Sequence, residues 1–254
     1  MKGKKKDRNL KRKKNIDIDQ KREQRKQYFF VIRELTSREI KRKYSRSYLG
    51  IVWSVLNPLL MMSVMSAIFT QIFERSIENY PIYYLTGNIV WHLFTGATNA
   101  AMTTLVDNKP LLIKARLPME VFVLARVYTA LVNFGYSLVA YVLMLVIFGI
   151  EPKITMLFFP VIVFFILLFS LGIAFILSTA YVFFGDIKHL YSVLLTLWLY
   201  CSAIFYPVDR LQGIMRSVIE FNPIFEYING LRNIVMHGVM PTTIELLRMS
   251  IWAI

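Results

Sequence analysis

The chain has 254 residues, of which 56% are hydrophobic, yet it carries a net charge of +14 from 30 basic and 16 acidic side chains. Nineteen of the lysines and arginines lie before residue 47, so most of the positive charge is separate from the apolar sequence that follows. This separation excludes a soluble globular fold and predicts a membrane protein whose basic N-terminus stays in the cytoplasm.

Five stretches lack Asp, Glu, Lys and Arg: residues 47–73, 79–106, 127–150, 154–185 and 189–208. Because an α-helix rises about 1.5 Å per residue, about 20 apolar residues cross the roughly 30 Å of hydrocarbon in a bilayer. We therefore predict an all-α integral membrane protein with six transmembrane helices. The expected spans are about 49–73, 81–106, 121–150, 154–184 and 189–208, with an incomplete sixth at 242–254 that favours truncation of the sequence.

Residues 1–27 are mostly Lys, Arg, Asn, Asp and Gln, a composition that cannot bury enough apolar surface to fold alone. We expect a disordered basic cytoplasmic tail. Beside a membrane span, such a run of charge favours contact with anionic membrane lipids, or a simple topology signal, over binding of nucleic acid.

Residues 28–48 have a helical period that predicts an amphipathic interface helix in the inner headgroup layer. A plain solvated helix leading into the first span is the alternative. Glu39 and Lys43 are four residues apart, as in a favourable ion pair along a helix. The residues that we expect to characterise this helix are Phe29, Ile32, Arg33, Arg38, Ile40 and Tyr44.

Residues 209–240 contain no charge-free run of spanning length, so two short re-entrant helices are expected between the fifth and sixth spans. Asn222-Pro223 separates these helices, since the residue before a proline avoids helical geometry. The one cysteine, Cys201, excludes a disulfide within the chain and a cysteine metal cluster.

Motifs for chemistry are absent from the sequence. It has no Gly-rich loop ending in Gly-Lys-Ser or Gly-Lys-Thr, no Ser/His/Asp set and no Cys/His cluster, so we expect neither an enzyme nor a metal or cofactor site in this chain. Ion-driven transporters usually keep charged groups near mid-membrane, whereas this chain keeps essentially none apart from Arg126 near an inner end. The energy source is therefore expected outside the chain.

The sequence from about residue 28 to its end resembles the permease subunits of ABC-2 type exporters, within the group that exports O-antigen, capsular polysaccharide or teichoic acid. One departure is Gly185, where that family commonly has arginine. The segments that carry the resemblance, in order, are 33–44, 48–59 (YLGIVWSVLNPL), 111–120 (LLIKARLPME), 183–190 (FFGDIKHL), 205–207 (FYP) and 222–223 (NP).

This resemblance implies a homodimer in the bacterial cytoplasmic membrane that works with two copies of an ABC ATPase subunit. ATP and magnesium would bind to that partner, and a lipid-linked glycan would pass between the permease subunits. The resemblance also implies that the loops 107–120 and 183–190 couple to the ATPase.

Two sets of candidate site residues follow. The loop at 109–120 is apolar and charged together, as a docking helix should be, although inside-positive topology alone also explains its charge. The coupling set is Lys109, Leu112, Ile113, Lys114, Arg116, Asp186 and Lys188. Since sugars stack on aromatic faces, the candidate substrate path is Trp91, Trp198, Tyr200, Phe205 and Tyr206, with helix packing as the alternative for both tryptophans.

Two other functions stay open at this point. The first is an ABC-2 exporter of drugs or lipids. The second is a membrane-embedded transferase, which would need acid/base groups near one face of the bilayer. The residues available for that chemistry are Asp209, Glu220, Glu226, His237 and Glu245.

Overall fold

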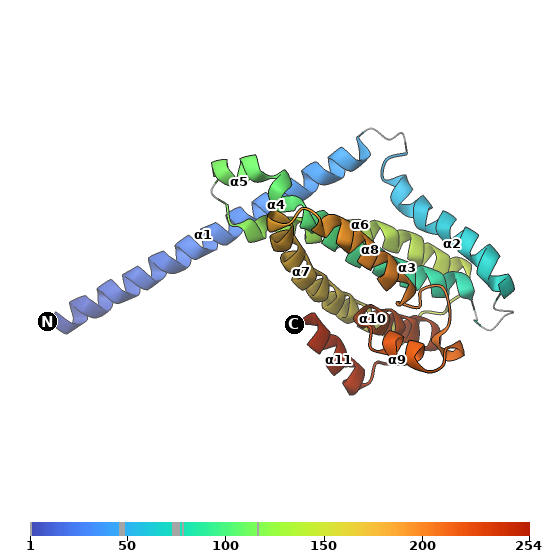
Figure 1. Cartoon of the computed structure of the whole chain (residues 1–254). Helices are drawn as coiled ribbons and strands as arrows, with labels where there is room; N and C mark the ends of the chain where they lie inside the picture. Colours follow the sequence, from blue (N-terminus) through green and yellow to red (C-terminus); the bar gives the residue numbers. More distant parts are fainter. Residues whose placement is uncertain (1, 46–48, 73–76, 78, 116) are drawn as a thin grey trace.

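The computed structural model describes the backbone of residues 2–45, 49–72, 77, 79–115 and 117–254, and over these residues every regular element is helical. A long helix leaves one corner of a bundle, in which the remaining helices lie side by side (Figure 1). The elements are α1 (Lys2–Tyr44), α2 (Val52–Ile72), α3 (Tyr80–Met102), α4 (Thr104–Asp107), α5 (Lys109–Ala115), α6 (Met119–Ile147), η1 (Ile154–Phe158), α7 (Phe159–Phe183), α8 (Ile187–Tyr200), η2 (Val208–Arg210), α9 (Ile214–Glu220), α10 (Pro223–Arg232), η3 (Asn233–His237) and α11 (Thr243–Ala253).

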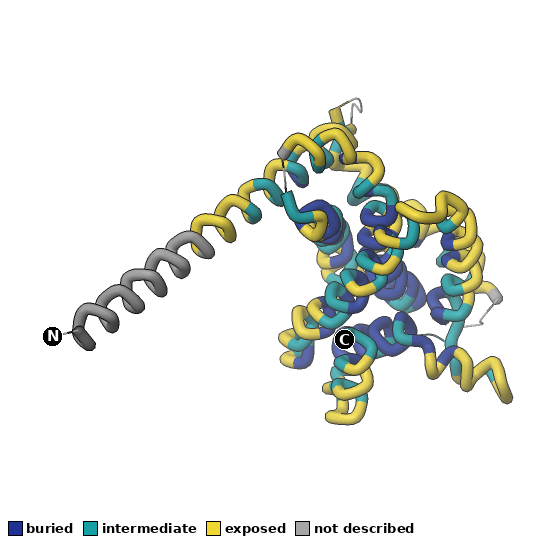
Figure 2. The backbone as a smooth tube through the Cα atoms, turned by 60° about the vertical axis from the view of Figure 1, so that its left-hand side comes forward, coloured by how far each residue is buried: buried dark blue, intermediate teal, exposed yellow. Residues whose placement is uncertain are grey.

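Helix α3 forms the centre of the bundle, where α2, α6, α7, α8 and α10 pack around it. Its residues Ile82, Leu85, Val90 and Phe94 are at most 1% exposed. Glycine and alanine on α3 let neighbouring backbones approach closely, as at helix contacts inside membranes. Figure 2 shows the buried residues gathered in these central helices, and exposed residues along the outer helices and the described part of α1.

Helix α1 differs from its prediction, because one continuous helix replaces the disordered tail at 1–27 and the separate helix at 28–48. No glycine or proline lies between residues 4 and 49, and the Lys, Arg, Gln and Glu of the tail are good helix formers, so nothing in the sequence ends the helix early. The helix ends at Tyr44, and residues 46–48 lie outside the described part.

The apolar stripe of α1 lies against α6 as well as outward. Thr36 is only 4% exposed, and Ile32, Ile40 and Tyr44 are half-buried, whereas Phe29 is 64% exposed. The half of the stripe nearest the bundle is therefore protein-packed, where the sequence predicts that all of it faces lipid. Arg33 and Arg38 are exposed, as the opposite face of an amphipathic helix requires.

Within the described residues, three helical segments are long and apolar enough to cross a membrane: Val52–Gln71, Met119–Ile147 and Ile154–Phe183. The predicted span at 81–106 is interrupted at Thr103 and has a buried polar face that includes Asn88 and Thr98. The absence of charged residues at 81–106 therefore did not mean that this stretch is apolar throughout.

The predicted fifth span at 189–208 is wrong in its second half, because α8 ends at Tyr200 and a turn follows. The side chains of Asn222 and Arg232, at the two ends of α10, donate to the Cys201 and Ala203 carbonyls of this turn, so these carbonyls have partners outside α8.

The segment after the turn forms the two short helices expected from the sequence, α9 and α10. Asn222 caps α10 by accepting a hydrogen bond from the Ile224 backbone N–H at 3.0 Å, and Pro223 follows it at the first helical position. Residues Ile224, Tyr227, Ile228 and Leu231 of α10 are completely buried. Helix α10 is therefore part of the core, and α11 packs beside it on α7.

Candidate functional site

Helix α5 holds four of the predicted coupling residues at one end of the bundle, next to α4 and α1 (Figure 1). Lys109, Ile113 and Lys114 are exposed, while Leu112 is half-buried. Arg116 lies outside the described residues. The segment predicted to dock therefore forms a helix that exposes an apolar side chain, Ile113, and two lysines.

Asp186 and Lys188 lie where α7 passes into α8, and both side chains are exposed. Because α4 packs against α7, this connection is at the same end of the bundle as α5. The fold thus brings the two predicted coupling segments to one face.

A groove of about 500 Å³ separates α1 from the segment around α5. Its walls combine apolar and charged groups, with Glu34, Arg38 and Lys41 contributed by α1 and Leu111 and Leu117 by the α5 segment. A surface of this kind suits a protein partner that buries an apolar side chain within a charged rim.

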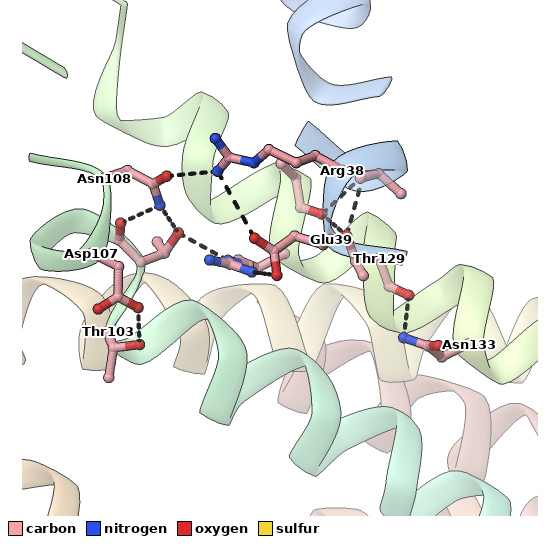
Figure 3. Close-up of polar contacts among 11 residues, drawn as sticks. Arg38, Glu39, Thr103, Asp107, Asn108, Thr129 and Asn133 are labelled. Carbon is pink, nitrogen blue, oxygen red and sulfur yellow. Dashed lines mark hydrogen bonds and ion pairs between the residues drawn. The ribbon is translucent and has the colours of Figure 1, made fainter. Parts of the chain in front are cut away.

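Asn108 lies between α4 and α5 and fixes their junction. Its backbone carbonyl accepts hydrogen bonds from the Leu111 and Leu112 N–H groups at 2.9 and 3.0 Å, which begin α5. Its buried side chain donates to the Thr104 carbonyl at 2.8 Å and accepts from Arg38 Nη2 at 3.1 Å (Figure 3). Asn108 therefore connects the start of α5 to α4 and α1 through hydrogen bonds.

An ion pair continues this contact into α6. Arg126 Nη1 lies 2.7 Å from Glu39 Oε2, and Arg126 Nε donates to Thr104 Oγ1 at 3.1 Å. Glu39 also lies 3.9 Å from Arg38 on its own helix (Figure 3). The expected pairing of Glu39 with Lys43 is replaced, because packing of α1 on α6 offers Glu39 a less exposed partner.

Hydroxyl groups join α1 and α6 next to this ion pair. Thr129 Oγ1 donates to the Ala125 carbonyl at 2.7 Å and lies 3.2 Å from Thr36 Oγ1, which is itself 3.3 Å from the same carbonyl. We call the set Thr36, Arg38, Glu39, Thr104, Asn108, Arg126 and Thr129 the junction network. It joins α1, α4 and α6 next to α5.

A cavity of about 880 Å³ opens beside the junction network, between the end of α1, the start of α2, α3 and α6. Arg42 and Lys43 lie on its wall without an acidic partner among the described residues, and the Glu39–Arg126 pair lies beside them. Lys43 donates to Asn133 Oδ1 at 3.3 Å. The charged groups on the cavity wall are therefore net positive, which suits an anionic group.

The two predicted path tryptophans lie inside the bundle. Trp91 is 8% exposed and packs against Phe94. Trp198 is half-buried, meets Phe94 edge-on and donates from Nε1 to Asn222 Oδ1 at 2.8 Å. Packing between helices accounts for these contacts.

The other three predicted path residues gather at the turn after α8. Tyr200 is 59% exposed, and Phe205 and Tyr206 are half-buried. Phe205 stacks on Phe69 and Tyr84. The turn therefore presents an aromatic surface at the end of the bundle opposite to α5 (Figure 1).

The residues proposed for a transferase do not converge. Glu226 pairs with Arg248 at 3.1 Å, Glu220 pairs with Arg216 at 2.7 Å, and Glu245 closes the capping box of α11 with Thr242. No cluster of His, Cys, Asp and Glu suitable for a metal ion is present in the part of the chain that the structure describes. These carboxylates are engaged in structural contacts.

Sequence reasoning missed Asn108, Glu39 and Thr104 as site residues, and it noted Arg126 only as a lone charge near a span end. The available signal was Arg126 itself, a charged residue at the edge of a charge-free stretch, because burial of such a group requires an oppositely charged or polar partner.

Comparison with known proteins identifies one matching family and three similar relatives. The family described as ABC-2 type transporter matches residues 31–236. The O-antigen export system permease protein RfbA of Myxococcus xanthus is 30% identical over 226 residues, which are 88% of this chain and 87% of that protein. RfbA of Klebsiella pneumoniae is 27% identical over 84% of the chain and 82% of the relative, and the polysialic acid transport protein KpsM of Escherichia coli is 23% identical over 85% of each.

Proposed function

The chain belongs to the ABC-2 type transporter family, and on this premise we propose that it is the membrane permease subunit of a bacterial polysaccharide exporter. The names of its relatives, which concern O-antigen export and polysialic acid transport, support a polysaccharide substrate. The exporter lies in the cytoplasmic membrane, and the basic N-terminal helix is on the cytoplasmic side.

The working unit is a homodimer with two copies of a separate ABC ATPase subunit, which bind ATP and magnesium. Each permease chain has six spans, α11 belongs to the last, and α9 and α10 form a re-entrant region on the outer side. This chain performs no chemical step. The exposed apolar face of α2, with Leu60, Val64 and Ile68, supports burial against lipid or a second subunit.

The observation that carries the proposal is the junction network directly behind α5. When the ATPase subunits close, they press on Leu112 and Ile113, and Asn108 passes this displacement to Arg38 and Thr104. Because polar side chains and an ion pair connect α1, α4 and α6, these helices tilt together. The junction network thus connects the docking surface to the long helices.

The substrate is a lipid-linked glycan that enters from the inner leaflet. The net positive cavity beside the junction network suits the charged end of such a lipid, with Arg42 and Lys43 as the cations. The aromatic turn with Tyr200, Phe205 and Tyr206 lies at the opposite end, where sugar rings can stack before release.

Docking is tested by replacing Leu112 and Ile113 together with aspartate, because buried charge at the contact opposes association. In a pull-down with the ATPase subunit, association and stimulated ATP hydrolysis should both fall by at least tenfold. The matched control is Ile113→Val, which keeps the apolar contact. Unchanged association of the double variant would refute this role for α5.

The substrate is tested in bacterial cells depleted of the chain. Lipid-linked glycan should accumulate on the cytoplasmic side, while surface glycan decreases. Normal surface glycan after depletion would exclude polysaccharide export, whatever the result of the docking experiment.

A further inference from the structure

Helix α8 ends after 14 residues, so it rises only about 21 Å, less than the thickness of a bilayer core. The last four carbonyl groups of a helix have no partner within it. Inside a membrane those groups need a donor from elsewhere, because water is absent. The residues after Tyr200 must therefore be capped by the rest of the protein.

Side chains supply the donors for nearly all carbonyl groups of the turn that follows α8. From residue 200 to residue 206, six of the seven backbone carbonyl oxygens accept a hydrogen bond from a side chain. The pairs are Tyr206 on Tyr200, Asn222 on Cys201, Arg232 and Tyr83 on Ala203, Arg232 on Ile204, Tyr80 on Phe205, and Tyr83 on Tyr206.

Arg232 is the single charged donor in this set, and it is only 3% exposed. Its Nη1 lies 3.0 Å from the Ala203 oxygen, its Nη2 lies 3.1 Å from the Ile204 oxygen, and both Nε and Nη2 lie 3.3 Å from the Tyr83 oxygen. Its guanidinium carbon is 3.4 Å from the centre of the Tyr83 ring. Among the described residues, no carboxylate pairs with it.

The surroundings are shaped around this guanidinium. Gly87 leaves room for it, since a Cβ at that position would lie 3.1 Å from Arg232 Nη2. Ala203 has a φ of 47°, a conformation that costs a non-glycine residue energy and persists where other contacts hold it. Two donors, from Arg232 and Tyr83, converge on the oxygen of this strained residue.

Broken helices in membrane transporters use the carbonyl groups at their ends to coordinate sodium ions or protons. We propose that Arg232 is a built-in cation of this kind and a positioning residue for export: it locks the turn at 201–206 to α3 and α10. The turn, the outer part of α3 and α10 then move as one body, and Phe205 and Tyr206 keep a fixed place at the outer end. The effect on export rests on the proposed function, whereas the lock itself does not.

Cys201 reports on this lock, because it is the single cysteine of the sequence, lies in the turn and is half-buried. The full chain is placed in lipid nanodiscs, where both faces are open to water, and its thiol is labelled with a charged maleimide. Arg232→Met should increase the labelling rate at least tenfold, because two carbonyl groups of the turn lose their charged donor. Arg232→Lys should give an intermediate rate, since a lysine keeps the charge but not the planar set of donors.

The matched control is Arg216→Met, which removes an exposed arginine of α9 and should leave the labelling rate unchanged. Equal labelling of the wild type and Arg232→Met would overturn the lock. If Arg232→Met is not recovered as folded protein, Arg232→Lys and Tyr83→Phe decide, and wild-type rates in both would overturn it.

A transport measurement separates positioning from mere stability. Per mole of assembled complex, Arg232→Lys should keep the ATPase activity but lower glycan export at least threefold. If export per mole of complex is unchanged and only the amount of recovered complex falls, Arg232 stabilises the fold but does not position the turn for export. A wild-type chain that exports no glycan would instead refute the proposed function and leave the labelling result standing.

Discussion

Two ion pairs formed by glutamates of α1 have the same N–O distance but different exposure, and this allows a direct test of the junction network. Arg126 and Glu39 lie 2.7 Å apart with side chains 15% and 20% exposed, while Lys26 and Glu23 lie 2.7 Å apart with side chains 62% and 71% exposed. Lys26 lowers the pKa of Glu23 through a hydrogen bond and its charge. If burial sets how much an ion pair stabilises the fold, replacing the Glu39–Arg126 pair should lower the melting temperature and replacing the Glu23–Lys26 pair should not.

The expected magnitude follows from the exposure of Glu39. Breaking a buried ion pair costs about 3–5 kcal/mol, because one charge is left without a partner. An exposed pair contributes about 0–1 kcal/mol. Since Glu39 and Arg126 are mostly but not fully buried, we expect Glu39→Gln to cost about 2 kcal/mol, which corresponds to a fall of about 4–8 °C in melting temperature for a chain of this size.

The assay is a double-mutant cycle on melting temperature in detergent, with Glu39→Gln, Arg126→Gln and the double variant. The double variant should lose less than the sum of the single losses, by about 1–2 kcal/mol, because the two residues share one interaction. The matched cycle with Glu23→Gln and Lys26→Gln should give no measurable coupling.

Two results would refute this reasoning. Additive losses at Glu39 and Arg126, within about 0.5 kcal/mol, would mean that the ion pair contributes nothing of its own. Equal coupling in the two cycles would mean that burial does not set the strength of these pairs.

Two further predictions concern single positions. Asn108→Ala removes the contacts to Arg38 and Thr104, so the free energy of unfolding should fall by about 1–3 kcal/mol, and export per ATP hydrolysed should fall as well. The control Asn99→Ala, at an exposed position, should leave both quantities unchanged. Wild-type export per ATP in Asn108→Ala would contradict the role of the junction network. Gly87→Ala places a methyl group 3.2 Å from Ile204 Cγ2 and should destabilise the protein by about 1–3 kcal/mol. The control Gly172→Ala, with no atom within 4 Å of its new Cβ, should not lower the melting temperature. Equal melting temperatures of Gly87→Ala and the wild type would show that the turn can shift to accept the methyl group.

The sequence alone identifies a membrane protein, because the length of a charge-free stretch is a local property that can be compared directly with the thickness of a bilayer. Helical structure within 28–48 and the break between two helices at Asn222-Pro223 could also be predicted, since periodicity and proline geometry depend only on neighbouring residues. The resemblance predicted a coupling helix in the loop at 109–120, and residues Lys109–Ala115 do form a helix with exposed side chains, while the coupling role itself stays a prediction.

The end of α8 and the partners of the buried charges were decided only by the tertiary structure. The hydroxyl of Thr36 binds a carbonyl 89 residues away, and Arg232 binds one 149 residues away. A local pattern at 189–208 could not reveal these donors, so the sequence predicted an unbroken helix there. The sequence by itself determined that the chain belongs in a membrane, because burial in lipid depends on how many apolar residues follow one another. Only the packing of distant helices decided where a span breaks, because a backbone carbonyl can leave its helix wherever another part of the fold supplies a donor.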